Sequence, residues 1–436
     1  MRIVFDATCL GMACRNAGWR TGVFRVADRV VRGLAHSPEC VLTLYAGQEP
    51  NGLHDYVTSL ASSDGLRGAP ILYPRSTRLA GFIGRHTNTG TGSFREVVTS
   101  RDPHVWARDL RLGSRIRRRA LQHGLGLVEN CLRAVEDRSL DSVDIFHSPA
   151  FAIPEKARRR AKLRKFTTVH DLTPILYPQY FPSAWIGPWE NALRSISHDD
   201  WVLSVSHSTK NDLCDVLNLD AARIFVTHLA ADEELFYPCS YTEQLAAVRA
   251  RYGIPDGPYV LSVSTLEPRK NMSHLVKCFA RMCDEQHLRD LSLVLVGGKG
   301  WLNDALFQAI SESRSVRDRI IVTGYVPDTD LAPFYSGALA FVYPSVYEGF
   351  GLPVLEAMQC GAPVVTSNTS SLPEVVGEAG IMVDPADADA LCAAMYELYS
   401  DPCLREDLAH RSVERAGQFS WDKCVQETLQ AYRTSL

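Results

Sequence analysis

The stretch Glu348-Gly-Phe-Gly-Leu-Pro-Val-Leu-Glu356 places two carboxylates at the ends of a glycine-rich turn that leads into a predicted helix. Its two glycines let the backbone approach a ligand closely, and its proline suits the first turn of a helix. The exposed N–H groups at such a helix start favour a diphosphate. Glu348 can then face whatever extends beyond the phosphates, and Glu356 can face a ribose. A strand-turn-helix corner with two solvated glutamates is the alternative interpretation.

A second segment, Val263-Ser-Thr-Leu-Glu-Pro-Arg-Lys-Asn271, combines a strand end with two adjacent cations at the start of another helix. Arg269 and Lys270 can neutralise a diphosphate leaving group. An isolated Arg-Lys pair is usually an ordinary surface charge at a loop. The presence of both segments in one chain favours a site for a phosphorylated ligand.

The rest of the chain alternates short Val- and Ile-rich runs with amphipathic segments, which indicates parallel strands joined by crossover helices and hence an α/β protein. Helices are predicted at about 22–35, 184–197 and 207–217. Strands are predicted at 2–7, 41–46, 143–147, 166–170, 201–205 and 224–228, and again at 259–264, 292–296, 319–323, 339–343, 363–366 and 380–383. The two sets predict two doubly wound sheets.

Between these two sets lie turn-forming residues, Tyr-Pro followed by Gly-Ile-Pro-Asp-Gly-Pro. They predict a domain boundary within 236–258. A length of 436 residues also exceeds what one hydrophobic core usually serves. Two such domains facing each other would bind ligands in the crevice beyond the carboxyl ends of their strands. That cleft is the expected active site.

Taken together, residues 259–436 resemble the C-terminal domain of the family GT4 glycosyltransferases. Beyond the two segments already quoted, the tail at Phe419-Ser-Trp421 and its helix resemble the family's closing element, which crosses back to the N-terminal domain. The other matching segments, in chain order, are Leu293-Val-Leu-Val-Gly-Gly298, Val322-Thr-Gly-Tyr-Val-Pro-Asp328 and Leu331-Ala-Pro-Phe-Tyr-Ser-Gly-Ala338.

The N-terminal half resembles the same family more loosely, through Val169-His-Asp-Leu-Thr-Pro174 and Ser204-Val-Ser-His-Ser-Thr-Lys-Asn-Asp-Leu213. Gly22-Val-Phe-Arg25 resembles the family's glycine-rich turn near the donor phosphates, although extra residues at about Cys9 to Thr21 lengthen the loop before it. Thr265 stands where many relatives carry an arginine, for which Arg269 is the expected substitute.

The resemblance implies the GT-B fold, with two Rossmann-like domains facing each other across a cleft. The implied domains are 1–238 for the acceptor, with a basic insertion at about 75–140, then 239–420 for the nucleotide-sugar donor. A helix at 421–436 would cross back to the first domain. The implied reaction is metal-independent transfer of a hexose-type sugar, with retention, from a nucleoside diphosphate sugar to a hydroxyl acceptor, without a cofactor.

The resemblance also assigns roles to individual residues. The catalytic set is His170, Arg269, Lys270 and Glu348, with His170 meeting the sugar from the opposite wall. The base would lie against Gly324 to Val326, and Glu356 would hold the ribose. The full donor-binding set is Gly22, Gly324, Tyr325, Val326, Gly349, Phe350, Gly351, Leu352 and Glu356.

Two classes of alternative remain at this point. Another GT-B enzyme, such as a nucleotide-sugar epimerase or a phosphorylase, would use the same cleft, although a phosphorylase needs a lysine that carries pyridoxal phosphate. A noncatalytic GT-B scaffold would bind a partner or a lipid, and the intact Glu348, Glu356, Arg269 and Lys270 argue against it. The acceptor is a glycan, a lipid-linked glycan or a small molecule, with polysaccharide assembly favoured.

Composition narrows the partners and the compartment. A net charge of −4 argues against a nucleic-acid partner bound through bulk charge. The 12 cysteines lack the spacing of a zinc site and fit a reducing, cytoplasmic compartment. An acid at Asp6 interrupts the first apolar run, and no stretch is long enough to span a membrane.

Two basic runs stand out in the first half. Residues 75–140 break the α/β rhythm, and the second run extends from Lys156 to Lys165. The interpretation as solvated helix faces competes with a surface for anionic lipid on the inner face of a membrane. The insertion's arginines are Arg108, Arg111, Arg115, Arg117, Arg118 and Arg119.

Overall fold

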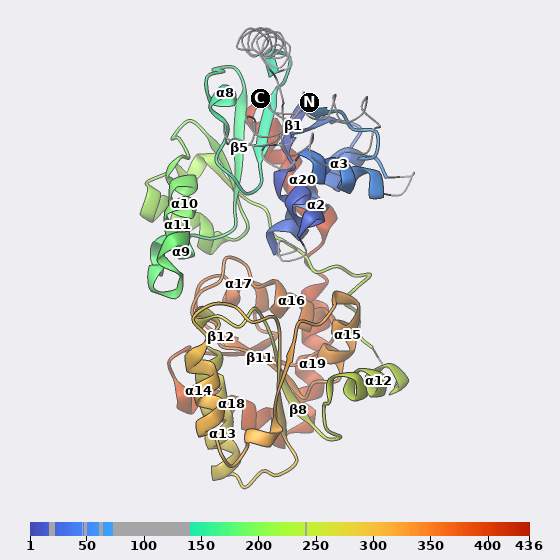
Figure 1. Cartoon of the computed structure of the whole chain (residues 1–436), viewed down its shortest axis with the longest axis vertical. Coiled ribbons are helices and arrows are strands. Elements are labelled where there is room, and N and C mark those ends of the chain that lie inside the picture. The colour runs from blue at the N-terminus through green and yellow to red at the C-terminus, as the bar shows by residue number, and fades with distance from the viewer. Residues whose placement is uncertain (17–21, 46, 48–49, 61–63, 73–139, 240–241) are drawn as a thin grey trace, which may run out of the picture. The chain divides into compact units, whose positions relative to one another are not determined.

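The computed structural model describes residues 1–16, 22–45, 47, 50–60, 64–72, 140–239 and 242–436 (Figure 1). The predicted basic insertion at about 75–140 lies outside the described residues except at its last position. Its arginines therefore stay a sequence-based prediction. The described part contains two parallel sheets, of seven and six strands, which confirms the predicted α/β class and its two doubly wound sheets.

The first sheet has the strand order β3-β2-β1-β4-β5-β6-β7. The strand pairs β1–β2, β1–β4, β2–β3, β4–β5 and β6–β7 are all parallel. The strands are β1 (Arg2–Asp6), β2 (Val41–Tyr45), β3 (Ile71–Leu72), β4 (Ile145–Ser148), β5 (Arg164–Val169), β6 (Trp201–Ser204) and β7 (Ile224–Val226). The α-helices of this part of the chain are α1 (Thr8–Arg15), α2 (Gly22–His36), α3 (Pro50–Ser59), α8 (Glu155–Arg158), α9 (Thr173–Leu176), α10 (Ser183–Arg194) and α11 (His207–Leu217).

The second sheet has the order β10-β9-β8-β11-β12-β13, which is the 3-2-1-4-5-6 order of a dinucleotide-binding fold. Its strands are β8 (Tyr259–Val263), β9 (Ser292–Val296), β10 (Ile320–Gly324), β11 (Ala340–Tyr343), β12 (Val364–Ser367) and β13 (Gly380–Val383). The helices are α12 (Thr242–Tyr252), α13 (Met272–Glu285), α14 (Asp304–Glu312), α15 (Asp328–Ser336), α16 (Leu352–Gln359), α17 (Leu372–Val376), α18 (Ala388–Ser400), α19 (Pro402–Ala416) and α20 (Trp421–Ser435). Short 3₁₀ helices occur at Pro178–Tyr180, Ala221–Arg223, Pro268–Lys270 and Arg317–Arg319.

Helices cover both faces of the second sheet, with α13, α14 and α18 on one side and α15, α16 and α19 on the other (Figure 1). A parallel sheet covered in this way must be apolar on both faces, which explains the unbroken run Ser-Leu-Val-Leu-Val in β9, where every residue is buried. Leu293 and Leu295 belong to the same core cluster as Leu275 and Phe279 of α13. This core fixes the strand ends that carry the candidate site.

The chain divides into two compact units, Met1–Thr168 with Tyr432–Leu436 and Val169–Ala431. In the first unit, Tyr432 is buried and its hydroxyl lies 2.6 Å from Nδ1 of His147 on β4, so the end of α20 packs with the first unit's strands. The predicted division at 1–238, 239–420 and 421–436 stays a prediction.

Two local expectations differ from the structure. The segment from Cys9 to Thr21, expected to lengthen a loop, contains the helix α1 at Thr8–Arg15. Strand β3, with only two residues, was not predicted. In α1, Gly11 packs so closely against Gly52 of α3 that a Cβ on Gly52 would lie 2.2 Å from the Gly11 carbonyl oxygen. This glycine–glycine contact between helices stabilises a segment whose own pattern did not indicate a helix.

Among the described cysteines, only Cys14 on α1 and Cys403 on α19 are exposed, and all of them are free thiols. No helix within the described ranges combines the length and the apolar character needed to cross a bilayer. The described part of the second basic run is partly paired: Arg159 bonds Glu155 at 3.1 Å, and Arg160 bonds Asp141 at 3.2 Å.

Candidate active site

Strand order places the candidate site. In the second sheet, β8 and β11 are neighbours whose crossover connections run in opposite directions, and ligands of such sheets bind beyond the carboxyl ends of these two strands. Arg269 and Lys270 follow β8, in the 3₁₀ turn Pro268–Lys270, and Glu348 follows β11. The topology therefore brings together the two segments singled out in the sequence.

Glu348 is the centre of this group. Lys270 Nζ lies 2.6 Å from Oε1 of Glu348, and Arg269 Nη1 lies 2.9 Å from Oε2. Ser345 donates its hydroxyl to Oε1 at 2.6 Å, and Lys270 Nζ also bonds the Tyr343 hydroxyl at 2.8 Å. One carboxylate thus joins both predicted cations.

Arg269 extends the group to a second acid. Its Nη2 lies 2.6 Å from Oε1 of Glu267, and its Nη1 donates to the Tyr347 carbonyl at 2.6 Å. The four charged side chains are nearly enclosed, with at most 12% of any one exposed, and their formal charges balance. The interpretation of Arg269, Lys270 and Glu348 as ordinary solvated charges is therefore wrong.

The electrostatics of Glu348 follow from burial and these partners. Burial by itself would raise its pKa, but the charges of Arg269 and Lys270 and the hydrogen bonds from Lys270 and Ser345 outweigh that effect and lower the pKa to about 2. Burial lowers the pKa of Lys270, as does the nearby charge of Arg269, while Glu348 and Glu267 act in the opposite direction. Glu348 is therefore an anion at neutral pH.

The turn that follows Glu348 is held by serines and shaped by glycines. Ser370 Oγ accepts the Glu348 N–H at 2.9 Å, and Ser371 Oγ donates to the carbonyls of Glu348 and Phe350, both at 2.9 Å. Gly351, at φ +105°, precedes the first residue of α16, Leu352. Left-handed backbone of this kind is open to glycine with little strain.

Gly349 meets the predicted residue His170 through its backbone. A Cβ on Gly349 would lie 1.7 Å from the His170 carbonyl oxygen, so only glycine fits there. The structure thus brings the turn of the Glu348 segment next to the strand-end His-Asp segment within one compact unit. A role for the His170 imidazole stays a prediction.

Glu356 lies inside α16 and is 3% exposed, which also excludes the solvated alternative for this residue. It accepts a hydrogen bond from the Tyr335 hydroxyl at 3.0 Å. The ribose role of Glu356 stays a prediction.

The predicted base-contacting segment is mostly at the surface. Gly324 ends β10 at φ +74° with open space where a Cβ would lie, and Tyr325 is 73% exposed. Val326 is instead 4% exposed, so its side chain contributes to the core and only its backbone is suited to contact a base. Gly22 begins α2 in the other compact unit, and its donor role stays a prediction.

Sequence reasoning missed several residues of the site. Glu267, Tyr343 and Ser345 complete the group around Arg269, Lys270 and Glu348, and Glu267 could have been found because it lies in the same quoted segment. It also missed a second polar cluster, in which His207, His228 and Glu374 offer ligand atoms within 4.8 Å of one another. No local spacing connects these three positions.

Two family models and one relative of known name identify the family of this chain. The family model described as glycosyl transferases group 1 matches residues 246–416, and the one described as glycosyltransferase family 4 matches residues 87–235. The chain is 39% identical over 291 residues to an O-antigen chain mannosyltransferase B of Escherichia coli, covering 66% of this chain and 74% of that protein.

Two further similarities are more distant. A serotype-specific mannosyltransferase WbdA of Escherichia coli is 26% identical over 269 residues, covering 60% of this chain but only 32% of that protein. The crystal structure of the Anabaena protein HepE with UDP and glucose aligns over the full length of both chains with a TM-score of 0.65 at 16% identity. At that identity the structural match concerns the fold.

Proposed function

We propose that this chain, which belongs to the family 4 glycosyltransferases, transfers a mannose-type hexose from a nucleoside diphosphate sugar to a hydroxyl of a growing glycan. The observation that carries this proposal is the buried group of Glu348, Arg269 and Lys270 at the switch point of the second sheet. Enclosed, fixed cations stabilise charge that develops on a leaving group without reorganising during the reaction.

In this proposal the protein's own charges act on the leaving diphosphate. Arg269 and Lys270 face the negative charge that develops as the bond between the sugar and the diphosphate breaks, and the N–H groups at the start of α16 add to them. Glu348 holds the two cations in place and orients the sugar hydroxyls. Glu356 binds the ribose, the backbone from Gly324 to Val326 binds the base, and His170 contacts the sugar.

Retention is proposed to follow from attack on the same face from which the diphosphate departs. The acceptor oxygen bonds to the anomeric carbon as the diphosphate leaves, and the acceptor proton passes to the leaving phosphate oxygen. Glu348 is ion-paired to both cations and is poorly placed to serve as a nucleophile. Because cations of the protein act on the diphosphate, we expect activity to survive EDTA.

The donor and the acceptor are inferred from relatives. Mannose is suggested by two relatives named as mannosyltransferases, and a polysaccharide acceptor by the one named for the O-antigen chain. The HepE structure, named for its complex with UDP and glucose, supports a nucleoside diphosphate. These relatives favour transfer over the epimerase, phosphorylase and scaffold alternatives.

A membrane-facing acceptor is a further part of the proposal. The exposed Lys162 and Arg164 lie in the basic run from Lys156 to Lys165, and exposed cations near an anionic bilayer contribute roughly 1 kcal/mol each. We expect the protein to sediment with anionic but not zwitterionic vesicles, and to be released by salt. Equal sedimentation with both vesicle types would remove this part of the proposal.

A two-step experiment tests the enzymatic proposal. First, GDP, UDP, dTDP and ADP are compared by thermal shift, because a ligand at 100 times its Kd stabilises the folded state by about 2.7 kcal/mol. One base should give a clearly larger shift. Second, mannose and glucose donors of that base are incubated with and without a mannan-type oligosaccharide. Retained transfer that needs the oligosaccharide supports the proposal, whereas epimerised donor without acceptor contradicts it.

A further inference from the structure

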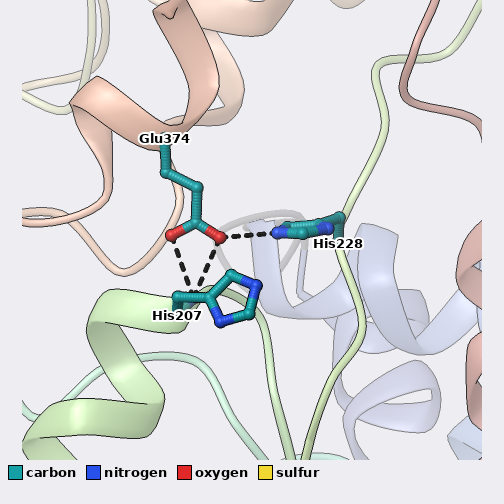
Figure 2. Close-up of side chains that lie close together, drawn as sticks. All are labelled: His207, His228 and Glu374. Carbon is teal, nitrogen blue, oxygen red and sulfur yellow. Dashed lines mark hydrogen bonds and ion pairs between the residues drawn. The ribbon is translucent and has the colours of Figure 1, made fainter.

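A second polar cluster lies in the unit Val169–Ala431, apart from the Glu348 group. Figure 2 shows His207 at the start of α11, His228 just after β7 and Glu374 on α17. His228 Nε2 lies 2.5 Å from Oε1 of Glu374, and one ligand atom from each of the three residues lies within 4.8 Å of the other two. Two imidazoles and a carboxylate therefore converge from three separate segments.

The surrounding structure holds two of these groups in place. Both oxygens of Glu374 accept the backbone N–H of His207 at 2.9 Å. The His228 ring packs against both Phe350, at a centroid distance of 6.2 Å, and Phe419, at 5.9 Å, and these two rings also contact each other. The His228 backbone N–H donates to Glu427 at 3.1 Å. Such outer contacts orient the ligands of metal sites.

The third group, His207, is exposed, and only its backbone is used in the contact with Glu374. Its imidazole is therefore accessible from solvent. A ligand atom of each of the three residues is therefore within reach of one ion.

We infer that His207, His228 and Glu374 form a binding site for a Zn²⁺-class transition-metal ion. Two imidazole nitrogens and one carboxylate are a ligand set that zinc uses, with bonds of about 2.0–2.2 Å, whereas Mg²⁺ and Ca²⁺ prefer oxygen ligands throughout. Metal entry replaces the direct His228–Glu374 hydrogen bond by one bond from each residue to the ion, and the proton on Nε2 of His228 is released to solvent or moves to Nδ1. Rotation of the exposed His207 ring supplies the third bond and leaves one position for water.

Two serines next to this site, Ser206 and Ser371, form hydrogen bonds with the turn that follows Glu348. Ser206, next to His207, donates its hydroxyl to the Gly349 carbonyl at 2.6 Å. Ser371, which directly precedes the helix α17 that carries Glu374, donates to the carbonyls of Glu348 and Phe350. An ion at the cluster would hold α11 and α17 together and so rigidify the turn, although it takes no part in the transfer chemistry proposed above.

The test uses full-length protein stripped with EDTA and freed of chelator. Titration with Co²⁺ and with Zn²⁺, followed by visible absorption and by calorimetry, should show one site, and Zn²⁺ should raise Tm without any nucleotide present. In His207→Ala, which keeps the backbone N–H bonded to Glu374, affinity should fall by more than the roughly 10- to 100-fold that loss of an outer-shell partner causes, and the Tm rise should disappear. His410→Ala, which removes an exposed histidine from α19, is the matched control and should bind as the wild type does.

Three results would overturn the inference. One is wild-type binding no tighter than that of His207→Ala, which would leave the cluster as an ion pair at the start of α11. Another is a loss of metal affinity in His410→Ala equal to that in His207→Ala, which would indicate binding at scattered surface positions. The third is a cobalt spectrum with strong thiolate charge-transfer bands, which would place the metal on cysteine. Because none of these measurements uses a sugar donor, they are independent of the proposed function.

Discussion

Asp6 and Glu348 are both buried carboxylates beyond the centre of a parallel sheet, one in each sheet, yet their partners differ. Asp6 ends β1 and accepts hydrogen bonds from the backbone N–H and the hydroxyl of Thr8, at 3.0 and 2.5 Å. Glu348 follows β11 and is paired with Arg269 and Lys270.

Although both carboxylates are buried, their pKa values therefore shift in opposite directions. Burial raises the pKa of Asp6 to about 6, against the smaller effect of the Thr8 hydrogen bonds, whereas the two cations lower the pKa of Glu348 to about 2. The comparison shows that neutral hydrogen bonds do not compensate for desolvation of a carboxylate, while two fixed cations do. In the described structure, it is the second sheet that combines buried charge with the predicted donor segments.

The largest expected effect on this comparison comes from Glu348→Gln. The substitution leaves Arg269 and Lys270 buried without the carboxylate that pairs with both, and removal of one member of a buried ion pair costs about 3–5 kcal/mol. We expect the free energy of unfolding, measured by urea denaturation at pH 7, to fall by that amount. Glu406→Gln, at an exposed position on α19, should change it by less than about 0.5 kcal/mol. Equal losses in both variants would contradict the ion-pair argument.

The second prediction concerns Asp6→Asn and pH. Because the pKa of Asp6 is raised from 3.8 to about 6 in the folded state, its stabilising contribution is complete below pH 4 and is lost as pH rises to about 6. That pKa difference corresponds to roughly 3 kcal/mol. Unfolding free energies at pH 4, 5, 6 and 7 should therefore decline for the wild type relative to Asp6→Asn. Parallel curves would mean that Asp6 titrates normally.

For Glu348 the sign is reversed. Its lowered pKa means that its contribution is present above about pH 4.5 and is lost as pH falls toward 2, so Glu348→Gln should lose its disadvantage on acidification. Measured across both pH windows, the two variants would show opposite trends.

Lys270→Met should affect catalysis. If Lys270 stabilises charge on the departing diphosphate, its loss should raise the activation free energy by about 2–4 kcal/mol. At saturating donor, kcat should then fall roughly 30- to 1000-fold. Lys277→Met removes an exposed lysine from α13 and should leave kcat unchanged. Thermal unfolding of both variants separates lost turnover from lost folding. Unchanged turnover in a folded Lys270→Met protein would remove Lys270 from the proposed mechanism.

The smallest effect is expected for Tyr335→Phe, which changes the surroundings of Glu356. Tyr335→Phe removes the hydroxyl that donates to Glu356, and the loss of such a hydrogen bond costs about 1 kcal/mol or somewhat more. If Glu356 binds ribose, donor KM should rise about fivefold in Tyr335→Phe and more in Glu356→Ala, with little change in kcat. Nucleotide affinity measured by calorimetry would be unaltered in both variants if the ribose assignment were wrong.

Much of the fold could be predicted because its strands are buried on both faces. The run Ser-Leu-Val-Leu-Val at 292–296 matches β9 residue for residue, since a doubly covered strand has little room for polar side chains. Helix α1 could not be predicted in the same way, because it depends on the contact between Gly11 and Gly52, far apart in the sequence.

For the candidate site, the sequence indicated several of the residues but not the contacts among them. Arg269, Lys270 and Glu348 were expected near one ligand because the two cations follow a predicted strand end, Glu348 precedes a glycine-rich turn, and both segments suit a diphosphate. Their mutual pairing depends on Ser345, Tyr343 and Glu267, whose side-chain directions no pattern indicates. The cluster of His207, His228 and Glu374 was missed because its ligands are dispersed over 167 positions between His207 and Glu374. Metal-site motifs detect local spacing, and this cluster has none.

The distribution of thiols offers a practical means to observe this protein at work. Cys14 lies in one compact unit and Cys403 in the other, and both are exposed, whereas most of the other described cysteines are buried. With Cys131 replaced by serine, a donor and an acceptor fluorophore attached to these two native thiols would form an energy-transfer pair. Its efficiency, recorded while nucleotide and glycan are added, would report whether the distance between the two labels depends on either ligand.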